Sequence, residues 1–189
     1  MPRPAQYIYR GIRTGEVDPP EGFGADDFRV PTFNEAVERF PTVNFDIEIK
    51  GSGFAALPTA IALSREITAL GIAESVIVVS SDDGVIRAFE TLTPGVATSP
   101  GAQALADWLL LGEPLDDRHR VVQLAPVLND VPVLTKSFWD AAARDELAVW
   151  VWMNDPGSQE NVLFYQELIA AGAGGIIAGR PNEMAAAGL

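Results

Sequence analysis

The sequence predicts an α/β protein in which about six strands are each followed by a helix. Three observations support this prediction. Short apolar runs rich in β-branched residues alternate with longer segments of helical period, which is typical of consecutive βα units. Most of these runs are apolar throughout, as expected for strands that are covered on both faces. Residues that favour helix ends stand at the boundaries between the two kinds of segment.

The apolar runs define the expected strands, which lie at 43–49, 74–81, 95–99, 120–126, 147–153 and 174–179. The segments between them define the expected helices, at 32–40, 57–70, 83–91, 101–111, 135–146 and 158–171, and we expect one more helical turn in the tail PNEMAAAGL. Residues 1–31 are rich in Gly, Pro and Asp and have no clear period. We therefore expect an irregular leading segment, 1–31, within a single domain that spans 1–189.

Individual residues predict where some helices begin and end. Thr32 followed by Glu35 forms a capping-box pattern. Ser158 is expected to cap the last long helix, and Ser81 is expected to cap a helix rather than to bind a ligand. Gly172 suits the left-handed position that ends a helix.

Composition excludes several classes of function. The formal net charge is −13, which argues against binding to nucleic acid or to an anionic membrane surface. The absence of cysteine excludes disulfides, thiolate zinc sites and cysteine nucleophiles. The start has no apolar signal-peptide core, and no apolar stretch approaches the ~18 residues of a membrane span. The cellular compartment stays open.

The strand at 43–49 carries charges on alternate positions. Side chains on a strand alternate between two faces, so Asp46 and Glu48, with Lys50 directly after the strand, share one face. The simplest interpretation is an edge strand whose charged face meets water. The alternative is that this face lines a binding site, because functional side chains of βα proteins gather at the carboxyl ends of parallel strands.

Two architectures fit this order of elements, an open doubly wound sheet and part of an eight-stranded (β/α)₈ barrel. The chain is short for the barrel, for which about 250 residues are typical. A dinucleotide-binding fold needs a Gly-rich turn after its first strand, and KGSGFAALP lacks the complete G-x-G-x-x-G spacing.

Three stretches, in this order, bear on that choice: VPTFNEAVERFPTVNFDIEIKG, SVIVVSSDDGVIRAF and VWVWMNDPGSQENVLFYQELIAAGAGGIIAGRP. Together they resemble motifs of the glycerophosphodiester phosphodiesterase family, namely a helix leading into a strand that ends Glu-Ile-Lys, a strand ending Ser-Ser, and a Trp/Asn-Asp segment followed by a Gly-rich strand. The resemblance implies a (β/α)₈ TIM-type barrel and metal-dependent hydrolysis of a glycerophosphodiester to an alcohol and glycerol 3-phosphate.

The resemblance also implies roles for three residues. Glu48 takes the position of a carboxylate ligand to a divalent cation, Ca²⁺ or Mg²⁺, and Lys50 that of a contact to the substrate phosphate. Trp152 is expected to line the substrate pocket, whereas core packing is the stronger interpretation for Trp150. For Asp46, an ion pair with a neighbouring strand is a stronger interpretation than catalysis.

Several family motifs are missing from this sequence. The His-Arg-Gly strand, the Glu-x-Asp strand and the His-Asp strand have no counterpart in this sequence. The segment YIYRGIRTG contains Arg10 and a following glycine, but Tyr9 stands where the histidine of the first motif would be needed. The single histidine, His119, lies in a charged loop before a strand, and we expect a solvated imidazole there. Gly179 stands where the family has Asp, and Trp152 and Asn154 are two apart rather than three.

These departures predict an incomplete barrel of about six βα units whose first strands are missing. No catalytic residue is assigned, and the chain alone is expected to be inactive because it lacks the acid–base pair and the other metal ligands. The alternative is a noncatalytic protein that binds a partner or completes a barrel. In either case exposed strand edges favour self-association.

Overall fold

The computed structural model describes residues 9–128, 130–186 and 188. The chain forms two compact units, Met1–Thr42 and Val43–Leu189. No observation tests the prediction of a single domain, and it stays a prediction. In the part of the chain that the structure describes, no helix combines the length and the apolar character needed to cross a membrane.

The first unit contains the 3-10 helix η2 (Ala25–Phe28) and the helix α1 (Phe33–Arg39). The predicted capping box of α1 is confirmed, because Glu35 N–H donates to Thr32 Oγ1 at 3.3 Å and Thr32 N–H donates to Glu35 Oε2 at 2.8 Å. Arg29 donates to both oxygens of the same carboxylate. The contact with Arg29, followed by those with Thr32, lowers the pKa of Glu35 to about 2.

The second unit is built on parallel strands that follow one another in chain order. One sheet has the order β1 (Phe45–Glu48), β2 (Val76–Val79) and β3 (Ala97–Thr98), and another has β4 (Val121–Leu124), β7 (Ala148–Trp152) and β8 (Gly175–Ile177). A parallel bridge between Thr98 and His119 links β3 to the segment that enters β4. The described part of the chain thus arranges six parallel strands in sequential order, without forming a closed barrel.

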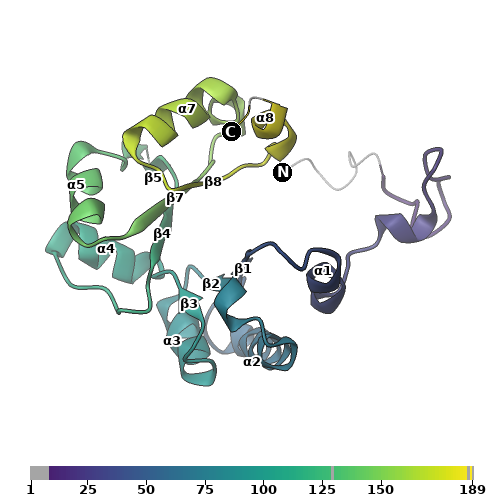
Figure 1. Cartoon of the computed structure of the whole chain (residues 1–189), viewed down its shortest axis with the longest axis horizontal. Coiled ribbons are helices and arrows are strands. Elements are labelled where there is room, and N and C mark those ends of the chain that lie inside the picture. Colours follow the sequence, from purple (N-terminus) through teal and green to yellow (C-terminus); the bar gives the residue numbers. More distant parts are fainter. Residues whose placement is uncertain (1–8, 129, 187, 189) are drawn as a thin grey trace. The chain divides into compact units, whose positions relative to one another are not determined.

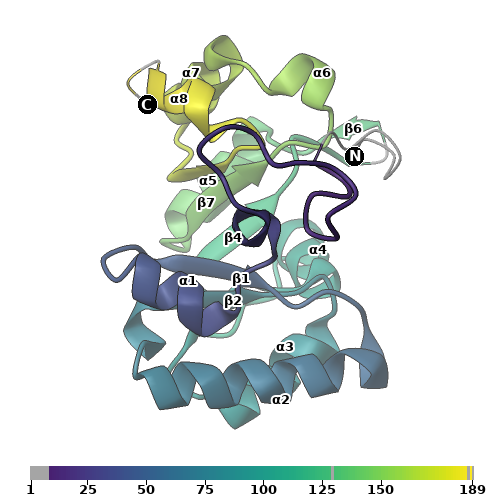
Figure 2. The same cartoon turned by 90° about the vertical axis from the view of Figure 1, so that its right-hand side faces the viewer.

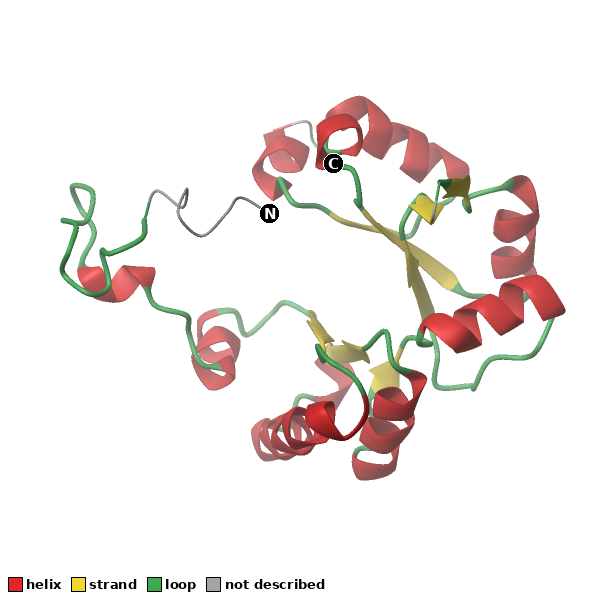
Figure 3. Ribbon diagram, turned by 180° about the vertical axis from the view of Figure 1, so that it is seen from behind, coloured by secondary structure: helices red, strands yellow, loops and turns green. Residues whose placement is uncertain are grey.

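Helices follow the parallel strands, so the predicted α/β class is confirmed. They are α2 (Gly53–Leu70), α3 (Asp83–Leu92), α4 (Ala102–Leu111), α5 (Lys136–Arg144), α6 (Pro156–Gln159), α7 (Val162–Ala171) and α8 (Pro181–Ala186), together with the 3-10 helix η3 (Ala73–Ser75). Their long members lie on the outer side of the strands (Figures 1 and 3). Figure 2 shows α2 and α3 along one face of the first strands.

The sequence did not predict the antiparallel hairpin of β5 (Val127–Leu128) and β6 (Val131–Pro132).

Two predicted caps are wrong. Asn161 caps α7 by accepting from Phe164 N–H at 3.0 Å, whereas Ser158 lies inside the short helix α6. Asp82, rather than Ser81, caps α3. In both cases an Asn or Asp closer to the helix supplies the acceptor. Gly172 ends α7 at φ 113°, as predicted.

One hydrophobic core lies between the strands and the outer helices. It contains Trp108, Val122, Leu124, Phe138, Ala142, Val149, Val151 and Leu168. Because side chains alternate along a strand, the residues between these on β4 and β7 point to the opposite, inner face. A second cluster, on that inner face, consists of Ile77, Val79 and Val121, with Ala97 and Trp150 packed against it.

Candidate ligand-binding face of the parallel strands

The inner face of the strands collects the polar residues that the sequence singled out. Strand register aligns Asp46 with Ile77 and Glu48 with Val79, so the charged face of β1 lies on the same side as the inner apolar cluster. The charged positions of the strand at 43–49 are therefore on the face away from the outer helices. Glu48 and Lys50 lie at the carboxyl end of that strand.

Asp46 reaches across the inner face to Gln123 of β4. Gln123 Nε2 donates to both carboxylate oxygens of Asp46 at 3.0 Å. Two strands, β2 and β3, lie between, and on a flat sheet this separation would be about 14 Å, beyond the combined reach of the two side chains. The strands must therefore curve, with Asp46 and Gln123 on the concave side.

The predicted ion pair for Asp46 is replaced by this bond to an amide. Burial raises the pKa of Asp46, the neighbouring Glu48 raises it further, and the bond from Gln123 lowers it. Sequence reasoning did not select Gln123. A signal for it was present, because Gln123 is the one polar residue within the apolar strand VVQL.

Glu48 and Lys50 form an ion pair with each other. Lys50 Nζ lies 2.6 Å from Glu48 Oε2, and the two side chains are 80% and 42% exposed, respectively. Both are thus accessible to a ligand at the carboxyl end of β1. The ammonium group has three N–H donors, so it can donate to a phosphate oxygen while it keeps its contact with Glu48.

A divalent cation does not fit the carboxylates of this face. Ca²⁺ takes six to eight oxygen ligands and Mg²⁺ takes six. Among the described residues, no group of three or more His, Cys, Asp and Glu side chains could hold a metal ion. An ammonium group already lies against Glu48, and Asp46 is held by Gln123. The described residues therefore do not form a complete cation site.

The two tryptophans of β7 differ in their surroundings. Trp150 packs against the inner apolar cluster and over Gly175, where a Cβ atom would come within 2.7 Å of its ring. Its expected role in packing is thereby confirmed. Trp152 lies two residues nearer the carboxyl end of β7, opposite Ile177 of β8, and is 38% exposed. Of the two, Trp152 presents the larger open surface to a ligand.

The loop after β7 is held by Gln159. Its Oε1 accepts hydrogen bonds from the backbone N–H groups of Asn154 and Asp155 at 2.9 and 3.0 Å. The Asn154 side chain donates to the carbonyl of Val127 in the β5–β6 hairpin at 2.5 Å. Asn154 therefore joins two loops at the carboxyl ends of β4 and β7.

Glu160 accounts for the glycine at position 179. Its carboxylate accepts from Gly179 N–H at 2.8 Å and from the Tyr165 hydroxyl. A Cβ atom on residue 179 would lie 2.7 Å from Glu160 Oε1, so the aspartate that the family resemblance leads one to expect would collide with this carboxylate. Burial, followed by the bond to Glu160, raises the pKa of Tyr165 to about 12.

The residues after β2 stabilise the loop structure. The Ser80 hydroxyl accepts from Asp82 N–H at 3.3 Å. Asp82 accepts from the N–H groups of Gly53, Gly84 and Val85, which lower its pKa. Because Asp82 accepts a hydrogen bond from the backbone N–H of Gly53, the first turn of α2 is stabilised at Gly53, and the helix begins earlier than its predicted start at 57.

The expectation of a solvated imidazole at His119 is wrong. Only 9% of His119 is exposed, and its Nδ1 lies 2.9 Å from Thr98 Oγ1 and 3.8 Å from Glu90 Oε1. The preceding Arg118 pairs with Asp116 at 2.9 Å in a tight turn. His119 contacts the outer helix α3 through Glu90, and it lies at the amino-terminal end of β4, away from the carboxyl end where Glu48 and Lys50 lie.

Comparison with known proteins leaves the family open. No protein-family model matches the chain, and no curated protein is significantly similar to it.

Proposed function

We propose that the second unit is part of a (β/α)₈-type barrel of the glycerophosphodiester phosphodiesterase kind, and that its concave face binds a glycerophosphodiester. The observation that carries this proposal is the contact of Asp46 with Gln123 across two intervening strands. Parallel strands in sequential order with strong curvature are typical of barrels, whereas a doubly wound sheet reverses its strand order.

Lys50 and Trp152 are the proposed substrate contacts. Lys50 supplies positive charge to the phosphate at the carboxyl end of β1, where barrel enzymes bind their ligands. Trp152 supplies an exposed aromatic surface on the same inner face for the alcohol or glycerol part of the substrate. Glu48 orients the ammonium group of Lys50 and would be the carboxylate that the carboxyl end of β1 offers to a cation.

We propose that this chain by itself binds the phosphodiester without hydrolysing it. Hydrolysis of this kind needs a general acid and base within reach of the bond that breaks. The single histidine of the sequence is buried beside Glu90 at the amino-terminal end of β4, and the described carboxylates of the inner face do not complete a cation site. A divalent cation bound with further ligands would polarise the phosphoryl oxygens.

Binding of glycerophosphocholine, measured by isothermal titration calorimetry, tests the proposed substrate class. We expect Lys50→Ala to weaken binding about fivefold, which is the scale of one exposed charge contact. Lys136→Ala is a matched control, because Lys136 also forms an exposed ion pair with a carboxylate, 2.7 Å from Asp140 on α5. Equal affinities of the two variants would refute the role of Lys50.

Turnover of the same compound with Ca²⁺ or Mg²⁺, compared between the chain and Glu48→Ala, tests the absence of hydrolysis. We expect no turnover from either protein, with folding confirmed by circular dichroism. Turnover by the wild-type chain that Glu48→Ala abolishes would refute the proposal, because it would show that the catalytic site is functional and requires Glu48.

A second candidate function is the completion of a barrel by association with another chain. The open edges favour it, because among the described strands β1 pairs only with β2 and β8 only with β7. Ile177 of β8 and Trp152 of β7 are partly exposed beside one of these edges. A partner strand would cover them and satisfy the backbone groups of the edge.

A further inference from the structure

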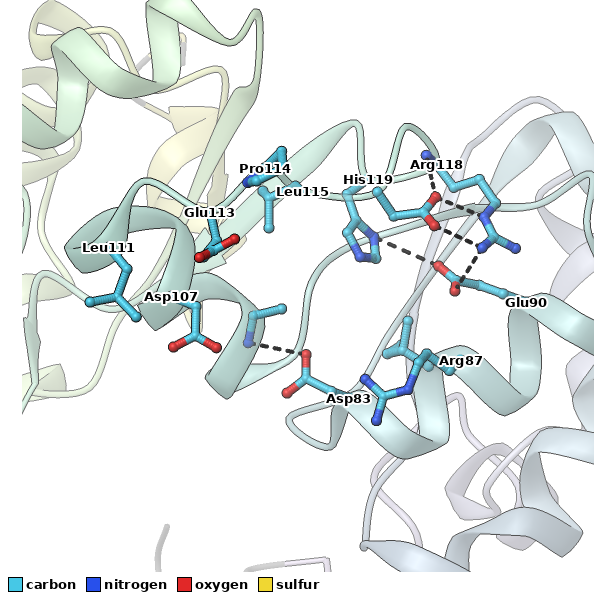
Figure 4. A pocket seen from close by; sticks show the side chains of 13 residues that line it. Asp83, Arg87, Glu90, Asp107, Leu111, Glu113, Pro114, Leu115, Arg118 and His119 are labelled. Atoms are coloured by element: carbon cyan, nitrogen blue, oxygen red, sulfur yellow. Dashed lines mark hydrogen bonds and ion pairs between the residues drawn. The ribbon is translucent and has the colours of Figure 1, made fainter.

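A cavity of about 530 Å³ lies on the outer side of the strands, between α3 and α4. Its wall on α3 includes Ile86 and Glu90, its wall on α4 includes Asp107 and Leu111, and the loop before β4 closes it with Glu113 and His119 (Figure 4). This volume is in the range of small-molecule sites. The cavity is separate from the inner face considered above.

His119 presents a free acceptor to this cavity. Thr98 donates its hydroxyl proton to Glu90 Oε1 at 2.7 Å, so the 2.9 Å contact between Thr98 Oγ1 and His119 Nδ1 requires the proton on Nδ1. The neutral ring then carries a lone pair on Nε2. Burial lowers the pKa of His119, which favours this neutral form.

Nε2 has no hydrogen-bond partner among the described residues, although the His119 side chain is only 8% exposed. No fully enclosed side-chain nitrogen or oxygen of the described residues lacks a partner, so Nε2 is accessible to solvent, and His119 lines both this cavity and the smaller one next to it. Figure 4 shows the ring at the cavity wall, with Glu90 beside it. A group that binds Nε2 must donate a hydrogen bond.

The charges of the cavity favour a cation. Five carboxylates and two guanidinium groups line it. Asp83 accepts from the backbone of α4, Glu90 from Thr98, and Asp116 from Arg118. Two carboxylates remain available among the described residues: Glu113 has no side-chain partner, and Asp107 uses only Oδ1, to accept from Gln103.

We propose that this cavity binds a small organic cation, whose N–H group donates to His119 Nε2 and whose charge is neutralised by Asp107 and Glu113. Ile86, Leu111 and Leu115 offer apolar surface to the carbon part of the ligand. The net charge of −13 attracts a cation to the protein as a whole. This site does not depend on the function proposed for the inner face.

Nuclear magnetic resonance of the His119 imidazole tests the proposal, because a chain with one histidine gives a single Cε1–H signal of that residue type. The probe is n-butylammonium. Two control compounds test the charge and the N–H donor of the probe separately. n-Butanol lacks the charge, and n-butyltrimethylammonium keeps the charge but lacks an N–H donor. We expect saturable movement of the signal with n-butylammonium, and much weaker responses to both controls.

Two variants test the carboxylate wall and the imidazole. Glu113→Gln is expected to weaken n-butylammonium binding about two- to fivefold, whereas the exposed Glu66→Gln on α2, with the same loss of charge, should leave it unchanged. His119→Asn keeps an N–H donor near Thr98 but removes Nε2. We expect it to weaken binding about three- to tenfold, measured by calorimetry.

Three results would overturn the proposal. The first is a histidine signal that n-butylammonium does not move in the wild-type protein, which requires no variant to fold. The second is an equal response to n-butanol, since binding would then be apolar only. The third is an equal loss of affinity in Glu113→Gln and Glu66→Gln, which would reflect net charge rather than the cavity.

Discussion

At the residue scale, Asp46 shows how position within a curved sheet changes the behaviour of a carboxylate. Alternation along the strand puts Asp46, Glu48 and Lys50 on one face, but only Glu48 and Lys50 are close to the end of β1 and pair with each other. Asp46 keeps an exposed side, yet its carboxylate is partly desolvated where it meets Gln123 of β4 and lies near the charge of Glu48, so the pKa of Asp46 is raised.

Replacement of Asp46 by Asn should therefore stabilise the protein at neutral pH. Because the folded-state pKa of Asp46 is raised above its ordinary value, the folded state binds the proton more tightly, and stability is lost as pH rises through that pKa. Asn has no charge to desolvate and can still accept from Gln123. Thermal unfolding of Asp46→Asn should show a higher Tm than wild type at pH 7, and a smaller advantage as pH falls toward 4.

The control for this prediction is Asp18→Asn, which removes the same charge from an exposed residue of the first unit. It should leave the Tm nearly unchanged at both pH values. A loss of stability in Asp46→Asn at pH 7 would show that the charged carboxylate is needed for the bond to Gln123.

At the element scale, the loops at the carboxyl ends of the strands depend on a few polar side chains that accept from backbone N–H groups. Asp82 ties the start of α2 to α3, Gln159 holds the loop after β7, and Glu160 binds the end of β8. Each contact satisfies backbone groups that would otherwise lack partners. These contacts therefore fix the conformation of the loops that follow the strands.

Gly179→Ala tests the contact at the end of β8. The added methyl group would meet the Glu160 carboxylate at 2.7 Å, and this carboxylate is also bound to Tyr165 and cannot move freely. We expect a loss of about 1–3 kcal/mol in the free energy of unfolding, measured with urea. Gly95→Ala is the control, because a Cβ atom there has open space around it and should change stability little.

Equal stabilities of the two alanine variants would mean that Glu160 moves away at no cost. In that case the contact with Glu160 would not explain why residue 179 is a glycine.

At the scale of the whole molecule, the second unit has two open strand edges in its described part. Its inner face carries exposed apolar side chains beside β8. Edges of this kind pair with other chains unless charge or covering elements prevent it. We expect the protein to self-associate in a concentration-dependent way.

Sedimentation velocity over a range of concentrations measures this association. Ile177→Lys puts a charge on β8 and should shift the protein toward the monomer. Leu110→Lys makes the same change on α4, where the side chain is 77% exposed, and should leave association unchanged. A wild-type protein that stays monomeric at all concentrations, or an equal effect of both variants, would contradict association through the edge.

Local sequence patterns were sufficient to predict the order and type of the main elements. Apolar period and local cap residues act over a few positions, so the parallel strands, the helices that follow them and the capping box at Thr32 were predicted correctly. Local alternation also predicted correctly that Asp46 and Glu48 share a face of β1. The β5–β6 hairpin escaped prediction because its strands have only two residues each.

Which side chains meet depends on the three-dimensional packing of the elements. Asp46 and Gln123 are 77 positions apart, and their contact depends on the curvature of the strands between them. His119 has charged neighbours in the sequence but is buried, because Thr98 and Glu90 bind its ring from other elements. Gly179 is explained by Glu160, which is distant in the chain. Such contacts arise from packing over long separations, and local sequence patterns carry no information about them.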